Sequence, residues 1–167
     1  MNTAAEGLKM SYAIRAIMFF SATVLSLVAS AKSTANLDKD GLALKGFDAV
    51  SYFQKDGPVP GSSKFQVVDE DGTFRFANEE NKIKFLAEPK KYKPQFGGWC
   101  AYAVADSKSK VDIDPKSFLI QDGRLLVFYN GVWADTRKKW QTAKGKSAQT
   151  FLKEADANWI TVKPQDP

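Results

Sequence analysis

The stretch SFLIQDGRLLVFYNG, residues 117–131, contains two apolar runs on either side of Asp122-Gly123. An Asp-Gly pair between two such runs is the strongest short-range signal for a β-hairpin. A second Asp-Gly pair, Asp71-Gly72, lies within KFQVVDEDGTFRFA, residues 64–77. The sequence therefore predicts two antiparallel hairpins.

A helix is predicted directly after the residue 64–77 hairpin, in NEENKIKFLAEPKKY. The segment begins with a capping asparagine and two glutamates that suit the first turn, and Pro89 ends the run. Ile83 and Leu86 share one helical face, with Phe85 beside them. We therefore expect this face to pack on the hairpin.

The chain after the residue 117–131 hairpin predicts two further helices, separated near Gly145. On the last one, Phe151, Ala155 and Trp159 recur at four-residue spacing and are expected to face the core. The predicted order is hairpin, helix, hairpin and then two helices. In βαβ units, by contrast, single strands alternate with helices. The predicted fold is therefore α+β, a small single domain with antiparallel β-hairpins packed against several short helices.

The N-terminus has the three parts of a secretory signal peptide. Lys9 and Arg15 supply positive charge, residues 16–28 form an uncharged apolar run, and Ala29-Ser30-Ala31 offers small residues for cleavage after Ala31. We expect an exported protein, periplasmic or secreted. The apolar run is shorter than the roughly 20 residues that span a bilayer, so no stable membrane span is expected after cleavage.

The expected organisation has four parts: a signal peptide over residues 1–31, a flexible leader over 32–41, a folded domain over 42–162 and a tail over 163–167. Without the signal peptide the net charge is +4, and it is spread along the chain. The densest basic run is Arg137-Lys138-Lys139. Such a short run fits a solvated helix face, so no nucleic-acid partner is expected.

The composition excludes several kinds of chemistry. The chain has no histidine and a single cysteine, so Ser-His-Asp and Cys-His pairs and the usual zinc or blue-copper sites are ruled out. There is also no glycine-rich phosphate-binding motif. The acidic run at residues 69–72 lacks the calcium-loop pattern and fits hairpin-turn chemistry. We therefore expect a protein that is not an enzyme.

The single cysteine lies in FGGWCAYAVADSK, residues 96–108. The segment CAYAVA within it is interpreted as a strand, on which Cys100 and Tyr102 would share one face. The thiol could then line a small aromatic pocket with residues from neighbouring elements. The candidate ligand-binding residues are Asp48, Tyr52, Trp99, Cys100, Tyr102 and Tyr129.

Three roles for the thiol stay open: a buried and inert side chain, a group that lines a ligand pocket, or an exposed redox or cross-linking thiol. Cys100 is also the only soft candidate for a metal ligand. The three methionines, Met1, Met10 and Met18, all lie in the predicted signal peptide. A copper-type metal would therefore have no thioether ligand in the mature chain.

Four segments together carry a family resemblance: GFDAVSYF, GTFRFANEENKIKFLAEPKKYKPQFGGWCAYAV, DGRLLVFYN and EADANW. In their order and spacing they resemble exported YHS domain-containing proteins, over roughly residues 42–159. The Gly-Gly-aromatic-Cys-Ala-Tyr segment is among the most specific parts. The resemblance implies a YHS-like domain. YHS-type domains in metal-handling proteins carry cysteines at places where this chain has Ala77 and Asn81, so the thiolates of that metal site are absent here.

The most favoured function is a non-enzymatic extracytoplasmic binding module, with a pocket near Cys100 for a small ligand or a metal. The alternative is an accessory protein that docks on an exported or membrane enzyme, with Cys100 purely structural. A thiol enzyme with Cys100 as nucleophile is the weakest hypothesis, because no activating base is visible.

Overall fold

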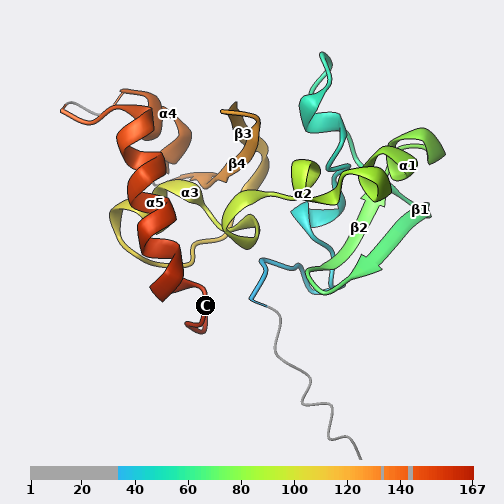
Figure 1. The fold of residues 1–167 in the computed structure, drawn as a ribbon, viewed down its shortest axis with the longest axis horizontal. Coiled ribbons are helices and arrows are strands. Elements are labelled where there is room, and N and C mark those ends of the chain that lie inside the picture. Colours follow the sequence, from blue (N-terminus) through green and yellow to red (C-terminus); the bar gives the residue numbers. More distant parts are fainter. Residues whose placement is uncertain (1–33, 133, 143–144) are drawn as a thin grey trace, which may run out of the picture. The chain divides into compact units, whose positions relative to one another are not determined.

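The computed structural model describes residues 34–132, 134–142 and 145–167, so the predicted signal peptide lies outside the described residues. Within these ranges, α-helices and three antiparallel two-stranded sheets confirm the predicted α+β fold (Figure 1). The elements in chain order, with η for 3-10 helices, are η1 (Leu44–Gly46), η2 (Ser51–Phe53), β1 (Ser62–Asp69), β2 (Gly72–Phe76), α1 (Glu79–Ala87), α2 (Pro89–Tyr92), η3 (Gln95–Gly98), α3 (Ala101–Asp106), β3 (Asp114–Gln121), β4 (Arg124–Phe128), β5 (Asn130–Gly131), β6 (Ala134–Asp135), α4 (Thr136–Thr142) and α5 (Ala148–Val162).

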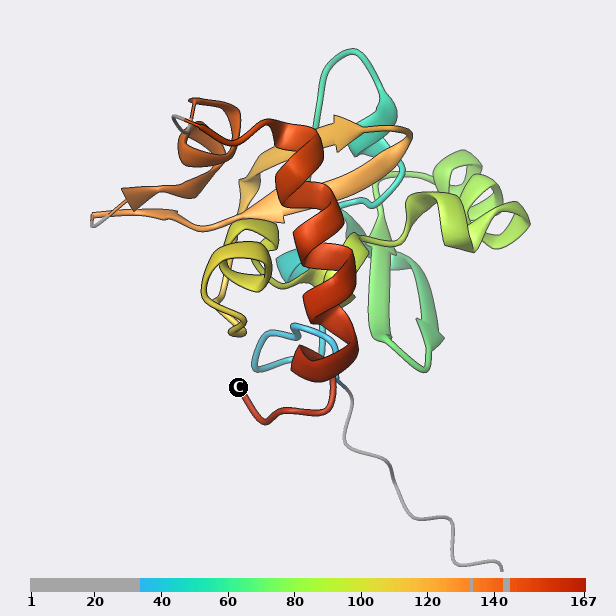
Figure 2. The same cartoon turned by 60° about the vertical axis from the view of Figure 1, so that its left-hand side comes forward.

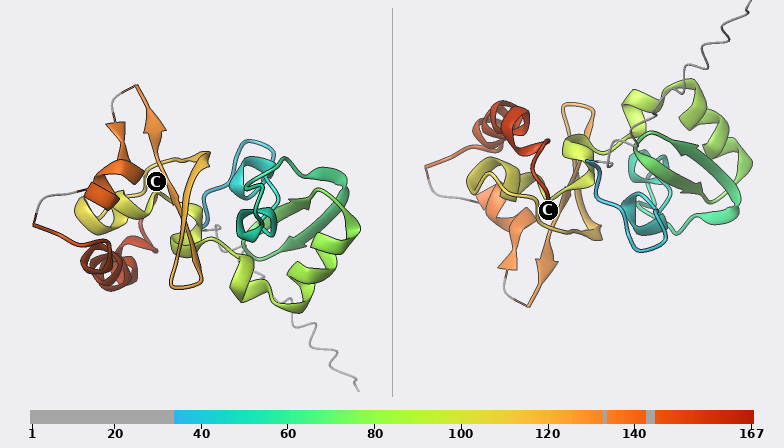
Figure 3. Two further views of the ribbon diagram at one scale, coloured as in Figure 1. Left: turned by 90° about the horizontal axis from the view of Figure 1, so that it is seen from above. Right: turned by 90° about the horizontal axis from the view of Figure 1, so that it is seen from below.

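Strand β4 is buried on both of its faces and separates two hydrophobic cores. Leu125 and Val127 belong to the first core, whereas Leu126 and Phe128 belong to the second. All four side chains have no exposed surface. Successive residues of a strand point to opposite faces, so an uninterrupted apolar run serves both cores at once. Figure 3 shows the β3–β4 hairpin between the two groups of elements.

The first core lies under the β1–β2 hairpin and α1. The ring of Phe85 is 4.8 Å from that of Phe74 and 5.0 Å from that of Phe76, centroid to centroid. The predicted packing face of α1 was wrong, because Ile83 and Leu86 are 58% and 55% exposed. On α1, Phe85 is the one apolar residue that is buried. The other buried residue of the helix, Asn81, lies one turn earlier on the same face and is polar. A search for apolar residues at helical spacing therefore does not reveal this face.

The second core lies between β4 and helices α3, α4 and α5, with α5 crossing this layer in Figure 2. Trp140 of α4 stacks on Phe151 of α5 at 5.3 Å. The predicted break near Gly145 and the predicted inward stripe on α5 are confirmed at Phe151 and Ala155, whereas Trp159 is only half-buried.

The segment Ala101–Asp106 forms the helix α3, so the predicted strand was wrong. Alanine favours helix strongly, and its small side chain lets two helices approach closely. Ala101 and Ala105 are buried in the second core together with Ala155 of α5. A short apolar run such as this one is compatible with a strand or a helix. Packing against α5 therefore selects the helix.

The two hairpin turns differ from each other. Asp122 and Gly123 have φ of 53° and 73° and form the predicted two-residue turn between β3 and β4. In the first hairpin the turn residues are instead Glu70 and Asp71, and Gly72 already belongs to β2 with φ of 109°. A Cβ at Gly72 would lie 2.4 Å from Cδ2 of Leu37. Contact with the N-terminal segment therefore requires this glycine.

The segment expected to be a flexible leader is hydrogen-bonded to the domain in its described part. The backbone N–H of Asn36 donates to the carbonyl of Gly97 at 2.8 Å, and Leu37 forms a β-bridge with Ala43. The folded domain therefore begins near Asn36 rather than at Leu42.

The fully buried carboxylate of Asp48 joins three parts of the first half of the domain. Its Oδ1 accepts from the backbone N–H of Val50 at 2.8 Å, in the turn that leads into η2. Its Oδ2 accepts from the N–H of Ala77 at 2.9 Å and from the side-chain amide of Asn81 at 2.6 Å. Ala77 and Asn81 are the two positions where the family resemblance placed metal-binding cysteines. In this chain they both contact Asp48.

We expect Asp48→Ala to lower the free energy of unfolding by about 3 kcal/mol, because it leaves several buried N–H donors without an acceptor. The measurement is urea denaturation followed by tryptophan fluorescence. Asp56→Ala, in an exposed loop, is the matched control and should change the value by less than about 0.5 kcal/mol. Equal stability of the two variants would contradict the role given to Asp48.

Candidate functional site

Cys100 lies in the interior of the domain. It has no exposed surface and directly precedes α3. Its Sγ is 3.3 Å from Oγ1 of Thr136, and its backbone N–H donates to the carbonyl of Val111. The immediate surroundings of the thiol are those of a packed core residue.

The three candidate tyrosines surround the same core. Tyr52 belongs to the first core, and Tyr102 and Tyr129 pack against it. The Tyr52 hydroxyl donates to the carbonyl of Pro115 at 2.8 Å. Burial, with smaller contributions from nearby carboxylates, raises the pKa of Tyr52 well above its ordinary value. Partial burial and then the neighbouring Asp106 also raise the pKa of Tyr102.

The remaining two candidates have structural partners of their own. Asp48 is saturated by its own hydrogen bonds, and Trp99 belongs to the second core. Among the described residues, no group of three or more His, Cys, Asp or Glu side chains could surround a metal ion. The predicted site residues therefore lie in or against the two hydrophobic cores.

A hollow of the domain lies elsewhere, between the N-terminal segment, η1, the tip of the first hairpin and η3. It has two adjoining parts, of about 20 and 220 Å³. Both parts are lined by Asp71, Lys93, Pro94 and Gly97. We call the smaller part the apolar pocket, the larger part the basin, and the two together the Lys93 groove.

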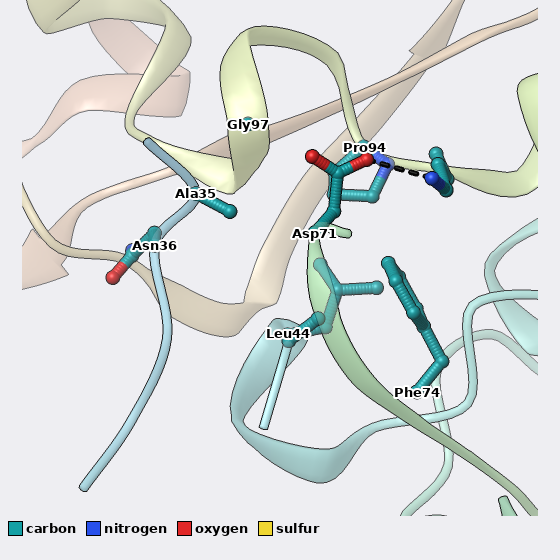
Figure 4. Close-up of a pocket in the computed structure, with 9 residues that line it drawn as sticks. Ala35, Asn36, Leu44, Asp71, Phe74, Pro94 and Gly97 are labelled. Atoms are coloured by element: carbon teal, nitrogen blue, oxygen red, sulfur yellow. Dashed lines mark hydrogen bonds and ion pairs between the residues drawn. The ribbon is translucent and has the colours of Figure 1, made fainter. Parts of the chain in front are cut away.

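The apolar pocket has a hydrophobic floor and a charged rim. Ala43, Leu44 and Phe74 line it, and Figure 4 shows Leu44 and Phe74 facing the space below Asp71. In the same view, one carboxylate oxygen of Asp71 carries the dashed line of its ion pair with Lys93, and the other oxygen carries none. Leu44 and Phe74 are buried, and the apolar pocket has room for about one water-sized group.

Lys93 is fixed at the centre of the groove by the tip of the first hairpin. Its Nζ lies 2.8 Å from Oδ2 of Asp69 and 2.7 Å from Oδ2 of Asp71. Burial works to lower the pKa of the ammonium, but its hydrogen bonds to the two carboxylates outweigh this effect and raise the pKa. Lys93 therefore stays charged, and its two ion pairs fix the hairpin tip against the segment that follows α2.

Two left-handed turns form opposite walls of the groove. In η1, Leu44 and Lys45 both have φ of 52°, and in η3, Phe96 and Gly97 have φ of 54° and 59°. For residues other than glycine this conformation costs roughly 1–2 kcal/mol each. Such strain persists only where surrounding contacts enforce it, and it concentrates at functional sites. Here the burial of the Leu44 and Phe96 side chains enforces it.

The basin is more polar and is completed by the last turn of α5. Trp159 and Lys163 lie four residues apart and therefore on one helical face, and both line the basin with Gln95. The Trp159 ring is 6.0 Å from that of Phe96. A Cβ at Gly97 would lie 3.5 Å from the Trp159 ring. The absence of a side chain at Gly97 therefore leaves the space beside this ring open.

The N-terminal wall of the groove is held by long-range hydrogen bonds. The indole N–H of Trp99 donates to the carbonyl of Thr34 at 2.8 Å. The Asn36 side chain donates to the carbonyl of Gly98 at 3.2 Å and to Asp112 at 3.0 Å. Trp99, predicted as a ligand contact, thus positions a wall of the groove instead.

Sequence reasoning missed the groove because its residues had been given other roles. The sequence assigns Asp71 to a hairpin turn and Trp159 to the hydrophobic core. Asp71 does lie in the turn of the first hairpin, and Trp159 is half-buried. Lys93 and Lys163 carried no motif. The one available signal was the Gly97-Gly98 pair, because glycine readily adopts the positive φ that these residues have, 59° and 80°.

Comparison of the chain with protein-family models, with curated proteins and with solved structures found no match. In the described ranges, none of the helices combines the length and the hydrophobicity that a membrane crossing needs. The functional assignment therefore depends on the geometry of the site.

We expect Cys100 in the native protein to react with iodoacetamide roughly 1,000-fold more slowly than a free thiol, because the thiol is reached only when the domain opens. The reaction is followed by mass spectrometry. In Ser107→Cys, which adds an exposed thiol at the end of α3, one of the two thiols should react quickly and the other slowly. Rapid reaction of Cys100 in the native state would contradict its place in the core.

Asp112 should make the stability of the N-terminal wall depend on pH. Burial works to raise the pKa of Asp112, but hydrogen bonds from Lys45, Asn36 and the Ile113 N–H outweigh it and lower the pKa. A carboxylate with a lowered folded-state pKa stabilises the fold above about pH 4, and this contribution is lost as the pH falls through the folded-state value.

The unfolding free energies of wild type and Asp112→Asn should therefore differ near neutral pH and converge toward about pH 3. Urea denaturation at several pH values measures this. Asp56→Asn, on an exposed loop, should keep the wild-type dependence. A constant difference between wild type and Asp112→Asn at all pH values would show that the lowered pKa is not the cause.

Proposed function

We propose that this chain is an exported, non-enzymatic binding protein that holds a small, partly apolar ligand in the Lys93 groove. The observation that carries the proposal is the basin, of about 220 Å³, where the half-buried Trp159 lies beside the fixed ion pair of Asp71 and Lys93. The basin thus offers an aromatic surface for affinity and oriented charges for selectivity.

Two further features support the groove as the site. Its walls include two strained left-handed turns, and such strain concentrates at functional sites. Cys100 and Asp48 have no exposed surface, whereas Lys93 and Trp159 line an open hollow. The proposal therefore keeps the expected binding function and moves its place from Cys100 to Lys93.

Export and membership of the YHS-like family remain part of the proposal. They rest on the N-terminal signal pattern and on the motifs between residues 42 and 159. The polar network of Asp48 and Asn81 is consistent with a domain of this type in which the thiolates have been replaced by a hydrogen-bonded carboxylate.

An accessory protein that docks on an exported or membrane enzyme is the second candidate. Ile83 and Leu86 favour it, because both are exposed on α1 and lie three residues apart on one helical face. In that case Cys100 is purely structural and the groove has no ligand.

We expect small organic fragments to perturb the NMR signals of the Leu44 and Gly97 amides and of the Trp159 indole when they are screened against the ¹⁵N-labelled protein expressed from the full chain. The library should include neutral, cationic and anionic fragments. Lys163→Trp places a large ring at the basin and should weaken this binding at least tenfold, because the ring occupies part of the ligand's volume.

The matched control is Lys153→Trp, which adds the same ring at an exposed position elsewhere on α5. It should leave fragment binding unchanged. If no fragment moves the groove signals, or if Lys163→Trp binds as well as wild type, the ligand-binding proposal fails and the docking function takes its place.

A further inference from the structure

The basin of the Lys93 groove combines an aromatic side chain with hydrogen-bond donors and acceptors, and this combination points to a class of ligand. On the basis of the proposed function, we infer that the ligand is a neutral sugar, held in the basin by one pyranose ring. The ring lies on Trp159, and two neighbouring hydroxyls of the sugar bind Asp71 and Lys93.

Trp159 has the features of a contact surface for a ligand. The indole N–H groups of Trp99 and Trp140 donate to protein oxygens, at 2.8 and 2.9 Å. Within the described part of the chain, the indole N–H of Trp159 donates to no protein acceptor. Its side chain is half-buried, and the Phe96 ring at 6.0 Å supports it edge to face. Trp159 therefore gives the basin a supported ring with a free donor.

The ion pair of Asp71 and Lys93 leaves one acceptor and one donor side by side. Two of the three N–H groups of Lys93 serve Asp69 and Asp71, at 2.8 and 2.7 Å. One carboxylate oxygen of Asp71 carries no ion pair (Figure 4). Because a hydroxyl both donates and accepts, one sugar hydroxyl donates to this oxygen while its neighbour accepts from the third N–H of Lys93.

Gln95 supplies further donors to the basin. Its Oε1 accepts from Nε and from one terminal nitrogen of Arg124, at 3.1 and 2.9 Å. Arg124 is itself fixed by a double contact with Asp156, at 2.9 and 2.6 Å. Because the oxygen of the Gln95 amide is committed to Arg124, its NH₂ group is left for another hydroxyl of the sugar.

The size and charge of the basin match a single neutral ring. Its volume of about 220 Å³ is below the roughly 300–1,000 Å³ of pockets for larger ligands. The charges of Asp71 and Lys93 compensate each other, so a charged ligand would compete with their ion pair. Lys163, the other charged side chain at the basin, is exposed, and water and salt screen its charge.

A flat aromatic molecule is the rival ligand, because it would also stack on Trp159. Such a molecule would cover the free oxygen of Asp71 and the NH₂ group of Gln95 without pairing them, which is unfavourable. A sugar pairs both groups and still offers the C–H groups of its ring to the indole. The polar groups around Trp159 therefore favour a sugar.

The test compares the methyl glycosides of glucose, galactose and mannose with sorbitol, cyclohexanol and phenol. Sorbitol has the hydroxyls without the ring, cyclohexanol has the ring without neighbouring hydroxyls, and phenol has an aromatic surface. Each is titrated into the ¹⁵N-labelled protein from the full chain, and the Gly97 amide and Trp159 indole signals report binding. At least one glycoside should bind at least fivefold more tightly than each of the other three compounds.

Asp71→Asn should weaken the binding of that glycoside at least fivefold and leave phenol unchanged, whereas general damage to the basin would weaken both. Asp56→Asn, on an exposed loop, is the matched control, with no change expected. If no glycoside reaches the fivefold margin, or if Asp71→Asn binds it like wild type, the sugar assignment is overturned. The proposed function then stands if other fragments of the library still move the groove signals, and it falls with the sugar assignment if none does.

Discussion

The burial of β4 on both faces is the constraint on which the rest of the structure depends. Leu125 and Val127 close one core, and Leu126 and Phe128 close the other, all without exposed surface. A shift of the strand by one residue would exchange these two sets, so the register of β4 is fixed from both sides. The turn at Asp122 sets the same register locally, and long-range packing and turn chemistry agree.

Strand β4 also supports one wall of the Lys93 groove. Pro94, which lines both halves of the groove, forms a β-bridge with Leu125 of β4. From there the chain enters the left-handed turn of η3, while the ion pairs of Lys93 attach the first hairpin to the same segment. The site therefore lies where elements of both cores meet, and its walls are supported by buried residues rather than by a free loop.

The parts of the fold that could be predicted are those governed by neighbouring residues. The Asp122-Gly123 turn, the Asn78 cap of α1 and the break near Gly145 each depend on local chemistry. The buried face of α1 could not be predicted, because its second buried residue is the polar Asn81, whose partners Asp48 and Gln54 are distant in the sequence. The groove could not be predicted either, since residues around 35, 71, 95 and 160 come together only through tertiary packing.

The hydrogen bonds that hold the N-terminal wall have a consequence for the order of folding. Thr34 and Asn36 contact Trp99, Gly98 and Asp112 across 62 to 76 residues of chain. Contacts that close such long loops form late, because the entropy of closure must first be overcome. The wall that emerges first during synthesis therefore has no surface to bind until η3 and the residues after α3 are in place. Until then the groove lacks one of its walls.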